Sequence, residues 1–178
     1  MSELASEQSG TAAFTAVVNP TAGRGAGAVV ARELADALPS GWVEVVHSRS
    51  QEHARDLAHE ACGRGRTVLA VGGDGLAGCV AGAVVEAGGV LGLVPAGRGN
   101  DFARQLGLPT GPAEVAEVVR AGHTRTVDVL DCAGRVVLGS VYAGVDSAAN
   151  AIVNARPRVT GAPTTSKNRG STDTKPTQ

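Results

Sequence analysis

The sequence predicts an α/β fold in which helices cover a sheet of parallel strands. Short apolar runs alternate with stretches of helical periodicity that are about 10–15 residues long. The apolar runs are uninterrupted, which is typical of parallel strands that are buried on both faces. Aromatic residues make up only 2% of the chain, so Val, Ala and Leu must build the core. Such small side chains favour close packing of helices on a sheet.

The first half of the chain predicts two strands, each followed by a helix. Residues 12–18 are a short apolar run, which predicts a buried strand. Helical periodicity follows over residues 26–38, and a Pro-Ser-Gly sequence then ends the helix. Residues 42–48 alternate in polarity as a strand does, and residues 51–62 have the spacing of an amphipathic helix.

The second half continues the same alternation. Residues 66–71 predict another buried strand, and residues 76–87 predict a helix of small side chains. Residues 90–95 predict a fourth strand, and residues 100–107 a short helix that a Gly-Leu-Pro sequence ends. Residues 112–122 predict the last helix, because their periodicity stops at a glycine.

From about residue 124 the pattern changes to strand, turn and strand. TRTVDVLDC and RVVLGSVYAG lie on either side of Ala133-Gly134, which predicts an antiparallel pair at the start of a second, β-rich unit. The last residues are rich in Thr, Ser, Pro and Gly and cannot form a core. The expected organisation is a flexible leader at 1–12, an α/β domain at 13–123, the first strands of a truncated β-rich domain at 124–160 and a disordered tail at 161–178.

The charge balance and the cysteines exclude several classes of function. The net charge is -1, so no basic field attracts nucleic acid. Cys62, Cys79 and Cys132 lack metal-binding or disulfide spacing and are expected to be reduced thiols in a cytoplasmic protein. The first dozen residues lack the pattern of a signal peptide. The apolar stretch at 68–97 is broken by acids and glycines, so we expect no membrane span.

Three glycine-rich turns each follow a predicted strand and precede a predicted helix. They are NPTAGRGAG (19–27), GGDGLAG (72–78) and PAGRGND (95–101). The carboxyl ends of parallel strands meet at one edge of a sheet, so we expect the turns to converge. Helix N-termini offer free amides to anions, and glycine lets the backbone come close. Each turn alone is explained as well by tight turning, but the set predicts a phosphate-binding rim.

Two common phosphate-binding motifs fit these turns less well. A Walker loop needs a lysine, and the first lysine of the chain is Lys167. The dinucleotide fingerprint is matched by Gly23, Gly25 and Ala28, and Glu44 follows at the distance of a ribose-binding acid. An Asn-Pro-Thr-Ala sequence separates the strand from these glycines, where the fingerprint requires a tight turn. A nicotinamide-dependent oxidoreductase therefore remains an alternative.

Taken together, the turns resemble the motifs of the diacylglycerol kinase catalytic family, which includes sphingosine kinases and bacterial lipid kinases. NPTAG resembles the family motif N-P-x-S-G, GGDG matches G-G-D-G-T, and PAGRGNDFAR resembles P-x-G-T-x-N-D-F-A-R. RTVDVLDC and YAGVDSAANAIVNA resemble the start of the second domain of that family. The resemblance covers roughly residues 14–160 and implies the nucleotide-binding fold that NAD kinases and phosphofructokinases share.

The resemblance implies an enzyme that transfers the γ-phosphoryl group of ATP to a lipid hydroxyl, such as that of diacylglycerol, with Mg²⁺. Asp74 is then the catalytic residue, acting through Mg²⁺ or water, and no residue is assigned as a metal ligand. Asp74 also suits the N-cap of the helix that follows, as Asn100 and Asp101 suit the next. The implied nucleotide-binding residues are Asn19, Pro20, Gly23, Ser48, Gly72, Gly73, Asp74, Gly75, Gly97, Asn100 and Asp101.

The chain departs from the family pattern at three positions. Leu76 replaces the signature Thr, Cys79 replaces an acid, and Arg98 replaces the first Thr of the third motif. The second domain of the family is also much longer than the residues present here, which puts the activity of this chain in question. An NAD kinase-like enzyme and a nucleotide-binding protein without catalysis are the alternatives. A lipid kinase would be cytoplasmic or peripheral at the inner face of the membrane, and able to form an oligomer.

Overall fold

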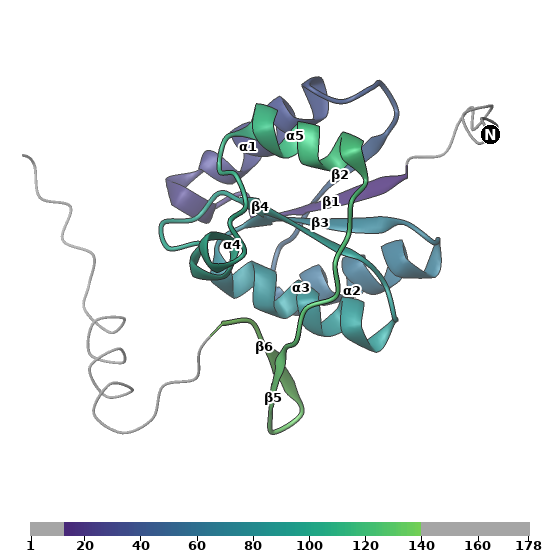
Figure 1. Ribbon diagram of the computed structural model, residues 1–178, viewed down its shortest axis with the longest axis vertical. Coiled ribbons are helices and arrows are strands. Elements are labelled where there is room, and N and C mark those ends of the chain that lie inside the picture. Colours follow the sequence, from purple (N-terminus) through teal and green to yellow (C-terminus); the bar gives the residue numbers. More distant parts are fainter. Residues whose placement is uncertain (1–12, 140–178) are drawn as a thin grey trace, which may run out of the picture. The chain divides into compact units, whose positions relative to one another are not determined.

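The four predicted strands form one parallel sheet in a computed structural model, which describes residues 13–139 (Figure 1). The strand order is β2-β1-β3-β4, so the first strand of the chain lies inside the sheet. Val17 of β1 lies opposite Val46 of β2 on one side and Ala70 of β3 on the other. The strands are β1 (Phe14–Val18), β2 (Val43–His47), β3 (Thr67–Gly72) and β4 (Leu91–Pro95).

Helices cover both faces of the sheet, with α1 and α5 on one face and α2 and α3 on the other (Figure 1). The short helix α4 follows β4. The helices are α1 (Ala26–Asp36), α2 (Gln51–Gly63), α3 (Asp74–Glu86), α4 (Asp101–Gln105) and α5 (Pro112–Ala121), and a 3-10 turn, η1, spans Ala22–Arg24. The predicted α/β fold is therefore confirmed.

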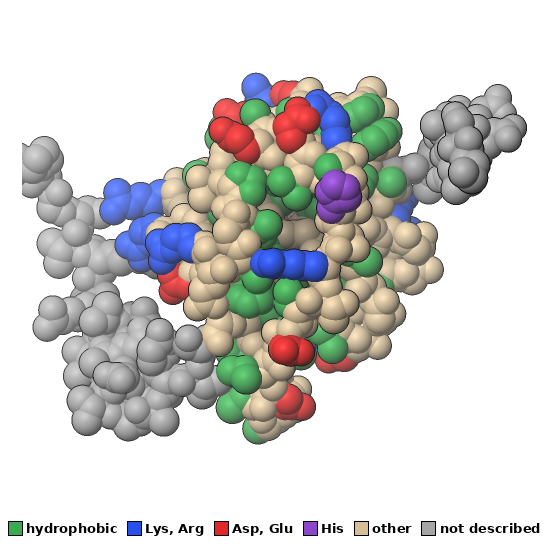
Figure 2. Space-filling view, viewed as in Figure 1, with side chains coloured by type: hydrophobic (Ala, Val, Ile, Leu, Met, Phe, Trp, Pro, Cys, Tyr) green, Lys and Arg blue, Asp and Glu red, His purple; other side chains and the backbone are tan. Residues whose placement is uncertain are grey.

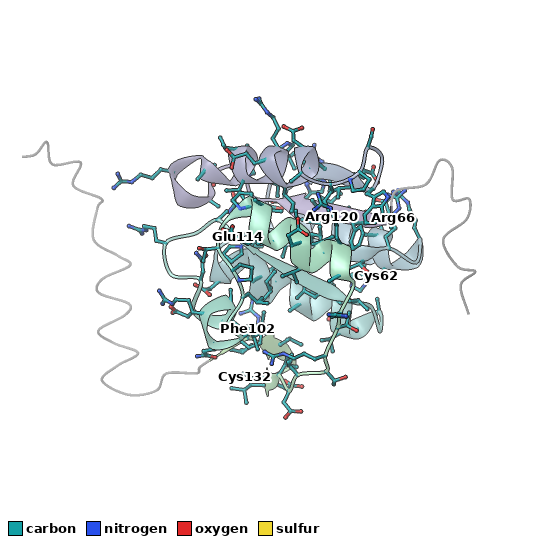
Figure 3. All side chains as sticks on the ribbon, turned by 45° about the horizontal axis from the view of Figure 1, so that its top comes forward. Cys62, Arg66, Phe102, Glu114, Arg120 and Cys132 are labelled. Atoms are coloured by element: carbon teal, nitrogen blue, oxygen red, sulfur yellow. The ribbon has the colours of Figure 1, made fainter. Side chains whose placement is uncertain are left out.

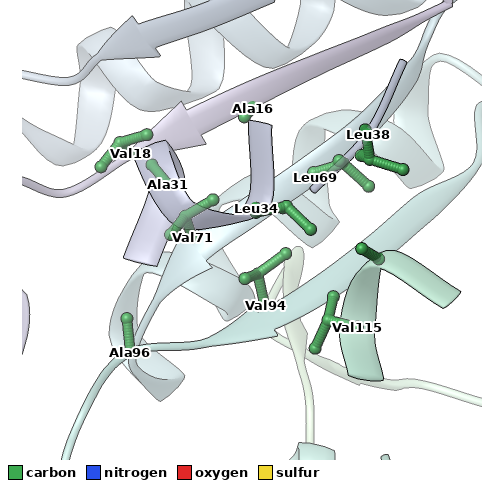
Figure 4. Packing of buried hydrophobic residues seen from close by; sticks show 11 residues of the cluster. Ala16, Val18, Ala31, Leu34, Leu38, Leu69, Val71, Val94, Ala96 and Val115 are labelled. Atoms are coloured by element: carbon green, nitrogen blue, oxygen red, sulfur yellow. The ribbon is translucent and has the colours of Figure 1, made fainter. Parts of the chain in front are cut away.

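The first hydrophobic core lies between the sheet and the helices α1 and α5. Side chains alternate along a strand, so Val18 points to this face while Val17 points to the opposite one. Leu34 of α1 and Val115 of α5 pack against Leu69 of β3, together with neighbouring aliphatic side chains (Figure 4). Arg120 extends from α5 and donates a hydrogen bond to the carbonyl of Ala37 just after α1 (Figure 3).

The second core lies on the other face and is built from small side chains. Ala54, Ala58 and Ala61 recur on one side of α2 at helical spacing and are fully buried. Their small size lets α2 lie close to the sheet and to Val80 of α3. This explains how a chain with so few aromatic residues closes its core.

The carboxyl-terminal part of the described chain differs from the sequence prediction. Residues 124–132 were expected to form one strand, but regular structure begins only at β5 (Leu130–Cys132). Within residues 13–139 the preceding segment pairs with no strand. β5 pairs in antiparallel fashion with β6 (Arg135–Val137), so the expected strand-turn-strand pattern is confirmed as a shorter hairpin. The leader, the tail and the region after residue 139 lie outside the described residues.

None of the helices within residues 13–139 has both the length and the apolar character that a membrane span requires.

Candidate functional site

The three glycine-rich turns lie together at the carboxyl edge of the sheet, as the sequence predicts. The first and third turns touch, because a Cβ on Gly23 would collide with the carbonyl oxygen of Ala96. The second and third turns touch as well, because a Cβ on Gly97 would lie 2.5 Å from Cα of Gly73. Glycine is therefore required at these contacts for space. The turns form one continuous backbone surface.

The first turn is fixed by Asn19 and by an unusual backbone. The amide of Asn19 donates to the carbonyl of Val71 at 3.1 Å, which ties this turn to β3. Its side-chain Oδ1 accepts hydrogen bonds from the amide and the hydroxyl of Thr21, at 3.0 and 2.8 Å. Gly23, Arg24 and Gly25 then have φ values of 56°, 64° and 100°. The backbone of Arg24 is thus in the left-handed region, which residues other than glycine rarely adopt.

The second turn places Asp74 at the beginning of a helix. Gly72 ends β3, Gly73 is the N-cap of α3 and Asp74 is its first residue, followed by Gly75. The expectation that Asp74 caps this helix is wrong, because α3 starts two residues earlier than predicted. The carboxylate of Asp74 instead accepts a hydrogen bond from the amide of Phe102, at 3.4 Å. It therefore links the second turn to α4.

The third turn is closed by Asn100, whose side chain bonds back to Gly97 and does not cap α4. Asp101 begins α4 and forms an exposed ion pair with Arg104. Two carboxylates approach the same point beside this turn. The Cβ position of Gly99 lies 2.8 Å from Oδ2 of Asp74 and 3.6 Å from Oδ1 of Asp101. A side chain at residue 99 would therefore occupy the space between two acidic groups.

Ser48 lies at the carboxyl end of β2, next to the residue that precedes the first turn. It follows the edge strand β2 and is buried, with 8% of its surface exposed. Its hydroxyl donates to the carbonyl of Val18 at 3.0 Å, and its amide donates to the same carbonyl at 2.8 Å. Ser48 therefore fastens the end of β2 to the end of β1.

A small, mostly apolar pocket lies between the second and third turns. Ala77 of α3, Leu93 of β4 and Phe102 of α4 form its apolar walls, and Asp74 and Asn100 lie at its polar side. Phe102 lies near the start of α4 and lines this pocket (Figure 3). The carboxylate of Asp74 therefore lies beside apolar side chains of α3, α4 and β4.

Basic side chains gather outside these turns. Figure 2 shows Arg side chains (blue) on the left of the molecule, over the loops that follow β1 and β4. Arg24, Arg98 and Arg104 of these loops are exposed. Arg104 is paired with Asp101, whereas Arg24 and Arg98 form no ion pair within residues 13–139. These two guanidinium groups can therefore meet an external anion without first breaking an internal pair.

The dinucleotide-binding alternative is not supported at Glu44. This residue lies opposite Thr15, near the beginning of β1 and away from the turns at the carboxyl edge. Its carboxylate pairs with Arg66 and, at 3.5 Å, with Arg64. The sequence spacing that predicted a ribose-binding acid thus corresponds to an ion-pair cluster.

Four residues of the site were missed by sequence reasoning. Thr21 fixes the side chain of Asn19, Ala96 meets Gly23, and Gly99 and Phe102 contact Asp74. Gly99 alone left a signal in the sequence, as the second glycine of the third turn. Ala96 and Phe102 act through backbone atoms, which any residue type supplies, and Thr21 acts through both its amide and its hydroxyl.

Comparison with known proteins finds one matching family and several relatives. The family model described as "Diacylglycerol kinase catalytic domain" matches residues 13–132. A diacylglycerol kinase of Mycobacterium tuberculosis is 38% identical over 122 residues, which are 65% of this chain and 38% of that protein. A probable lipid kinase YegS-like protein of Enterobacter is 32% identical over 115 residues, which are 60% of this chain and 38% of that protein.

Solved structures of diacylglycerol kinases are also similar to this chain. A crystal structure of a diacylglycerol kinase from Bacillus anthracis superposes with a TM-score of 0.59 at 29% identity. The match covers 69% of this chain and 44% of that one. The chain thus spans less than half the length of the relatives that it matches.

Proposed function

The chain belongs to the diacylglycerol kinase catalytic domain family, and we propose that it binds ATP at the three converging turns and takes part in phosphoryl transfer to a lipid hydroxyl. The observation that carries this proposal is the convergence of Asp74 and Asp101 beside Gly99. Two carboxylates on a glycine-lined backbone surface suit a magnesium-bound polyphosphate, because the backbone accommodates phosphate oxygens while the acids accommodate a cation.

The start of α3 is the proposed phosphate-binding element. Gly73 is the N-cap of α3, and it has no side chain that could bond to the free amides in the first helical turn of α3. These amides and the positive end of the helix dipole favour an anion at this position. Asn19, Pro20 and Gly23 form the neighbouring lip of the proposed site, and Gly97 forms the opposite one. The guanidinium groups of Arg24 and Arg98, which form no ion pair in the described part of the chain, add positive charge at its rim.

Asp74 and Asp101 are the proposed partners of Mg²⁺. The donor set fits this ion, which is usually held by one or two carboxylates together with phosphate oxygens and water. When bound, Mg²⁺ would neutralise charge on the transferred phosphoryl group. Asp74 keeps one oxygen on the amide of Phe102 and directs the other toward the Cβ position of Gly99. Its orientation is therefore set before a ligand arrives.

The departures from the family pattern have structural explanations. Leu76 is 7% exposed and belongs to the core between the sheet, α2 and α3. Cys79 donates its thiol hydrogen to the carbonyl of Gln51 at 2.9 Å, and burial raises the pKa of this thiol. Cys79 is therefore neutral at pH 7 and joins α3 to α2. We propose that neither residue contacts the nucleotide, and that the backbone surface carries the binding.

The first experiment measures nucleotide binding and turnover by the purified chain. Isothermal titration with ATP, with and without Mg²⁺, is compared for the wild type, Asp74→Asn and Asp56→Asn. Asp56 is exposed on α2, away from the turns, and serves as the control. We expect magnesium-dependent ATP binding that Asp74→Asn weakens at least about tenfold and Asp56→Asn leaves unchanged. Equal binding by all three proteins would contradict the proposed role of Asp74.

Turnover distinguishes the remaining functions. Labelled ATP is incubated with the chain and either diacylglycerol in mixed micelles or NAD. Phosphorylation of diacylglycerol supports the proposal, and phosphorylation of NAD instead would assign an NAD kinase-like activity. ATP binding with neither product would indicate a nucleotide-binding unit without catalysis in this chain.

A further inference from the structure

Asn100 uses both ends of its side-chain amide within the third turn. Its Oδ1 accepts a hydrogen bond from the amide of Gly97 at 3.0 Å, and its Nδ2 donates one to the carbonyl of Gly97 at 3.0 Å. The side chain thus satisfies both polar backbone groups of one residue. Such a pair of bonds holds the turn in a single shape.

The backbone of Asn100 is suited to this task and to few other residue types. Its φ and ψ are 53° and 42°, in the left-handed region that asparagine tolerates better than most residues. It precedes α4, yet its side chain makes no capping hydrogen bond to that helix. The left-handed conformation and the direction of the amide both serve the bonds to Gly97.

Gly97 in turn lies directly against the second turn. Its Cβ position is 2.9 Å from Oδ1 of Asn100, 2.5 Å from Cα of Gly73 and 3.1 Å from the nitrogen of Gly73. The space that a side chain at residue 97 would need is therefore filled by the side chain of Asn100 and the backbone of Gly73. Because Gly73 is the N-cap of α3 and precedes Asp74, a displacement of Gly97 must displace the proposed phosphate-binding element.

We infer that Asn100 is a positioning residue, which sets the shape of the nucleotide site through Gly97 and Gly73 before any ligand binds. This inference rests on the proposed function and refines it, because it gives Asn100 a role distinct from direct nucleotide contact. The contacts run from the side-chain amide of Asn100 to Gly97, and from Gly97 to Gly73. The third turn thereby sets the geometry of the second turn.

Three variants test the inference. Asn100→Gly retains the left-handed conformation and removes both hydrogen bonds. Asn100→Asp retains an acceptor for the amide of Gly97 but faces the carbonyl of Gly97 with a second oxygen. Ala133→Gly is the control, because Ala133 also has a positive φ, of 53°, but lies in the hairpin turn between β5 and β6.

The decisive measurements use the protein without nucleotide. Amide hydrogen exchange and NMR chemical shifts are recorded for Gly97, Gly73 and Asp74, with the amide of Val71 in the core of β3 as the internal reference. We expect Asn100→Gly to raise exchange at Gly97 at least about tenfold and to move the signals of Gly73 and Asp74, while exchange at Val71 stays unchanged. Asn100→Asp should give a smaller change, and Ala133→Gly none.

ATP titrations then separate the inference from the proposed function. If Asn100→Gly weakens ATP binding but leaves the ligand-free signals of Gly97 and Gly73 unchanged, Asn100 contacts the nucleotide and the inference is wrong. If the wild type binds no ATP, the proposed function fails, yet the ligand-free measurements still decide whether Asn100 positions the two glycines. Unchanged exchange and unchanged binding together would also overturn the inference.

Discussion

Gly73 and Gly97 meet with no side chain between them, and a Cβ on Gly97 would lie 2.5 Å from Cα of Gly73. Neither glycine has a positive φ. The contact therefore requires glycine because of space, and not because of backbone conformation. A Cβ on Gly73 would lie 3.3 Å from Cα of Gly97, so the close approach of the two turns depends chiefly on the missing side chain at Gly97.

Substitution of Gly97 by alanine should separate the second and third turns. The added methyl group collides with backbone atoms, which cannot rotate away as a flexible side chain can. We expect the free energy of unfolding to fall by about 1–3 kcal/mol and ATP affinity to fall at least about tenfold. Urea unfolding and isothermal titration measure the two effects.

Gly78→Ala is the matched control for this substitution. Gly78 lies inside α3, and no atom comes within 4 Å of its Cβ position. Alanine there should raise the free energy of unfolding by about 0.5–1 kcal/mol and leave ATP affinity unchanged. A Gly97→Ala protein that behaves like Gly78→Ala would contradict the proposed contact.

Ser48→Ala tests whether the end of β2 belongs to the nucleotide site. The hydroxyl of Ser48 is buried and donates to the carbonyl of Val18, which also accepts from the amide of Ser48. We expect a loss of about 1 kcal/mol in the free energy of unfolding and less than a twofold change in ATP affinity. A tenfold weaker affinity would instead support the nucleotide-binding role that the sequence predicts for Ser48.

Glu86→Gln should change how stability depends on pH. Arg55 of α2 hydrogen-bonds this carboxylate at 2.8 Å and thereby lowers the pKa of Glu86, with a further bond from His59. A lowered pKa in the folded state means that the ion pair stabilises the protein above pH 4.5, the ordinary value. This contribution disappears as the pH falls through the folded-state pKa.

The measurement for Glu86 is urea unfolding of the wild type and the variant between pH 3 and pH 7. We expect a difference in stability at pH 7 that shrinks toward zero below pH 4. Glu52→Gln on α2 is the control, since Glu52 forms no ion pair among the described residues. A difference that stays constant over the whole pH range would show that the effect is not electrostatic.

Leu34→Ala tests the core between the sheet and the helices α1 and α5. Leu34 is fully buried, so its truncation leaves a cavity and should lower the free energy of unfolding by about 2–5 kcal/mol. Val29→Ala on the same helix is the control, because Val29 is 57% exposed and should change stability by less than about 0.5 kcal/mol. Urea unfolding of both variants gives the comparison.

The strands and the converging turns could be predicted because their signals are local. The uninterrupted run at residues 66–71 predicts a buried parallel strand, and the four predicted strands are confirmed. Parallel strands that alternate with helices place their carboxyl ends at one edge. The meeting of Gly73 and Gly97 follows from that rule once their turns are identified.

The exact roles of Asp74 and Asn100 could not be predicted in the same way. An N-cap directly precedes its helix, but α3 begins at Asp74 itself, so Asp74 lies in the first helical turn. Helix boundaries are uncertain by one or two residues in any sequence. Asn100 lies where a cap is expected, but its amide turns back to Gly97. Both differences depend on loop geometry, which residue types do not determine alone.

The position of β1 inside the sheet has a consequence for the way the chain folds. β1 is synthesised first, yet its two neighbours are β2 and β3, and β3 ends only at Gly72. At about 5–20 residues per second, the unpaired edges of this apolar segment remain open for several seconds during translation. Among the described strands, β1 cannot begin folding as a local hairpin, because its parallel partners are distant in sequence. Both edges of β1 are therefore open to pairing with other chains until β3 emerges from the ribosome.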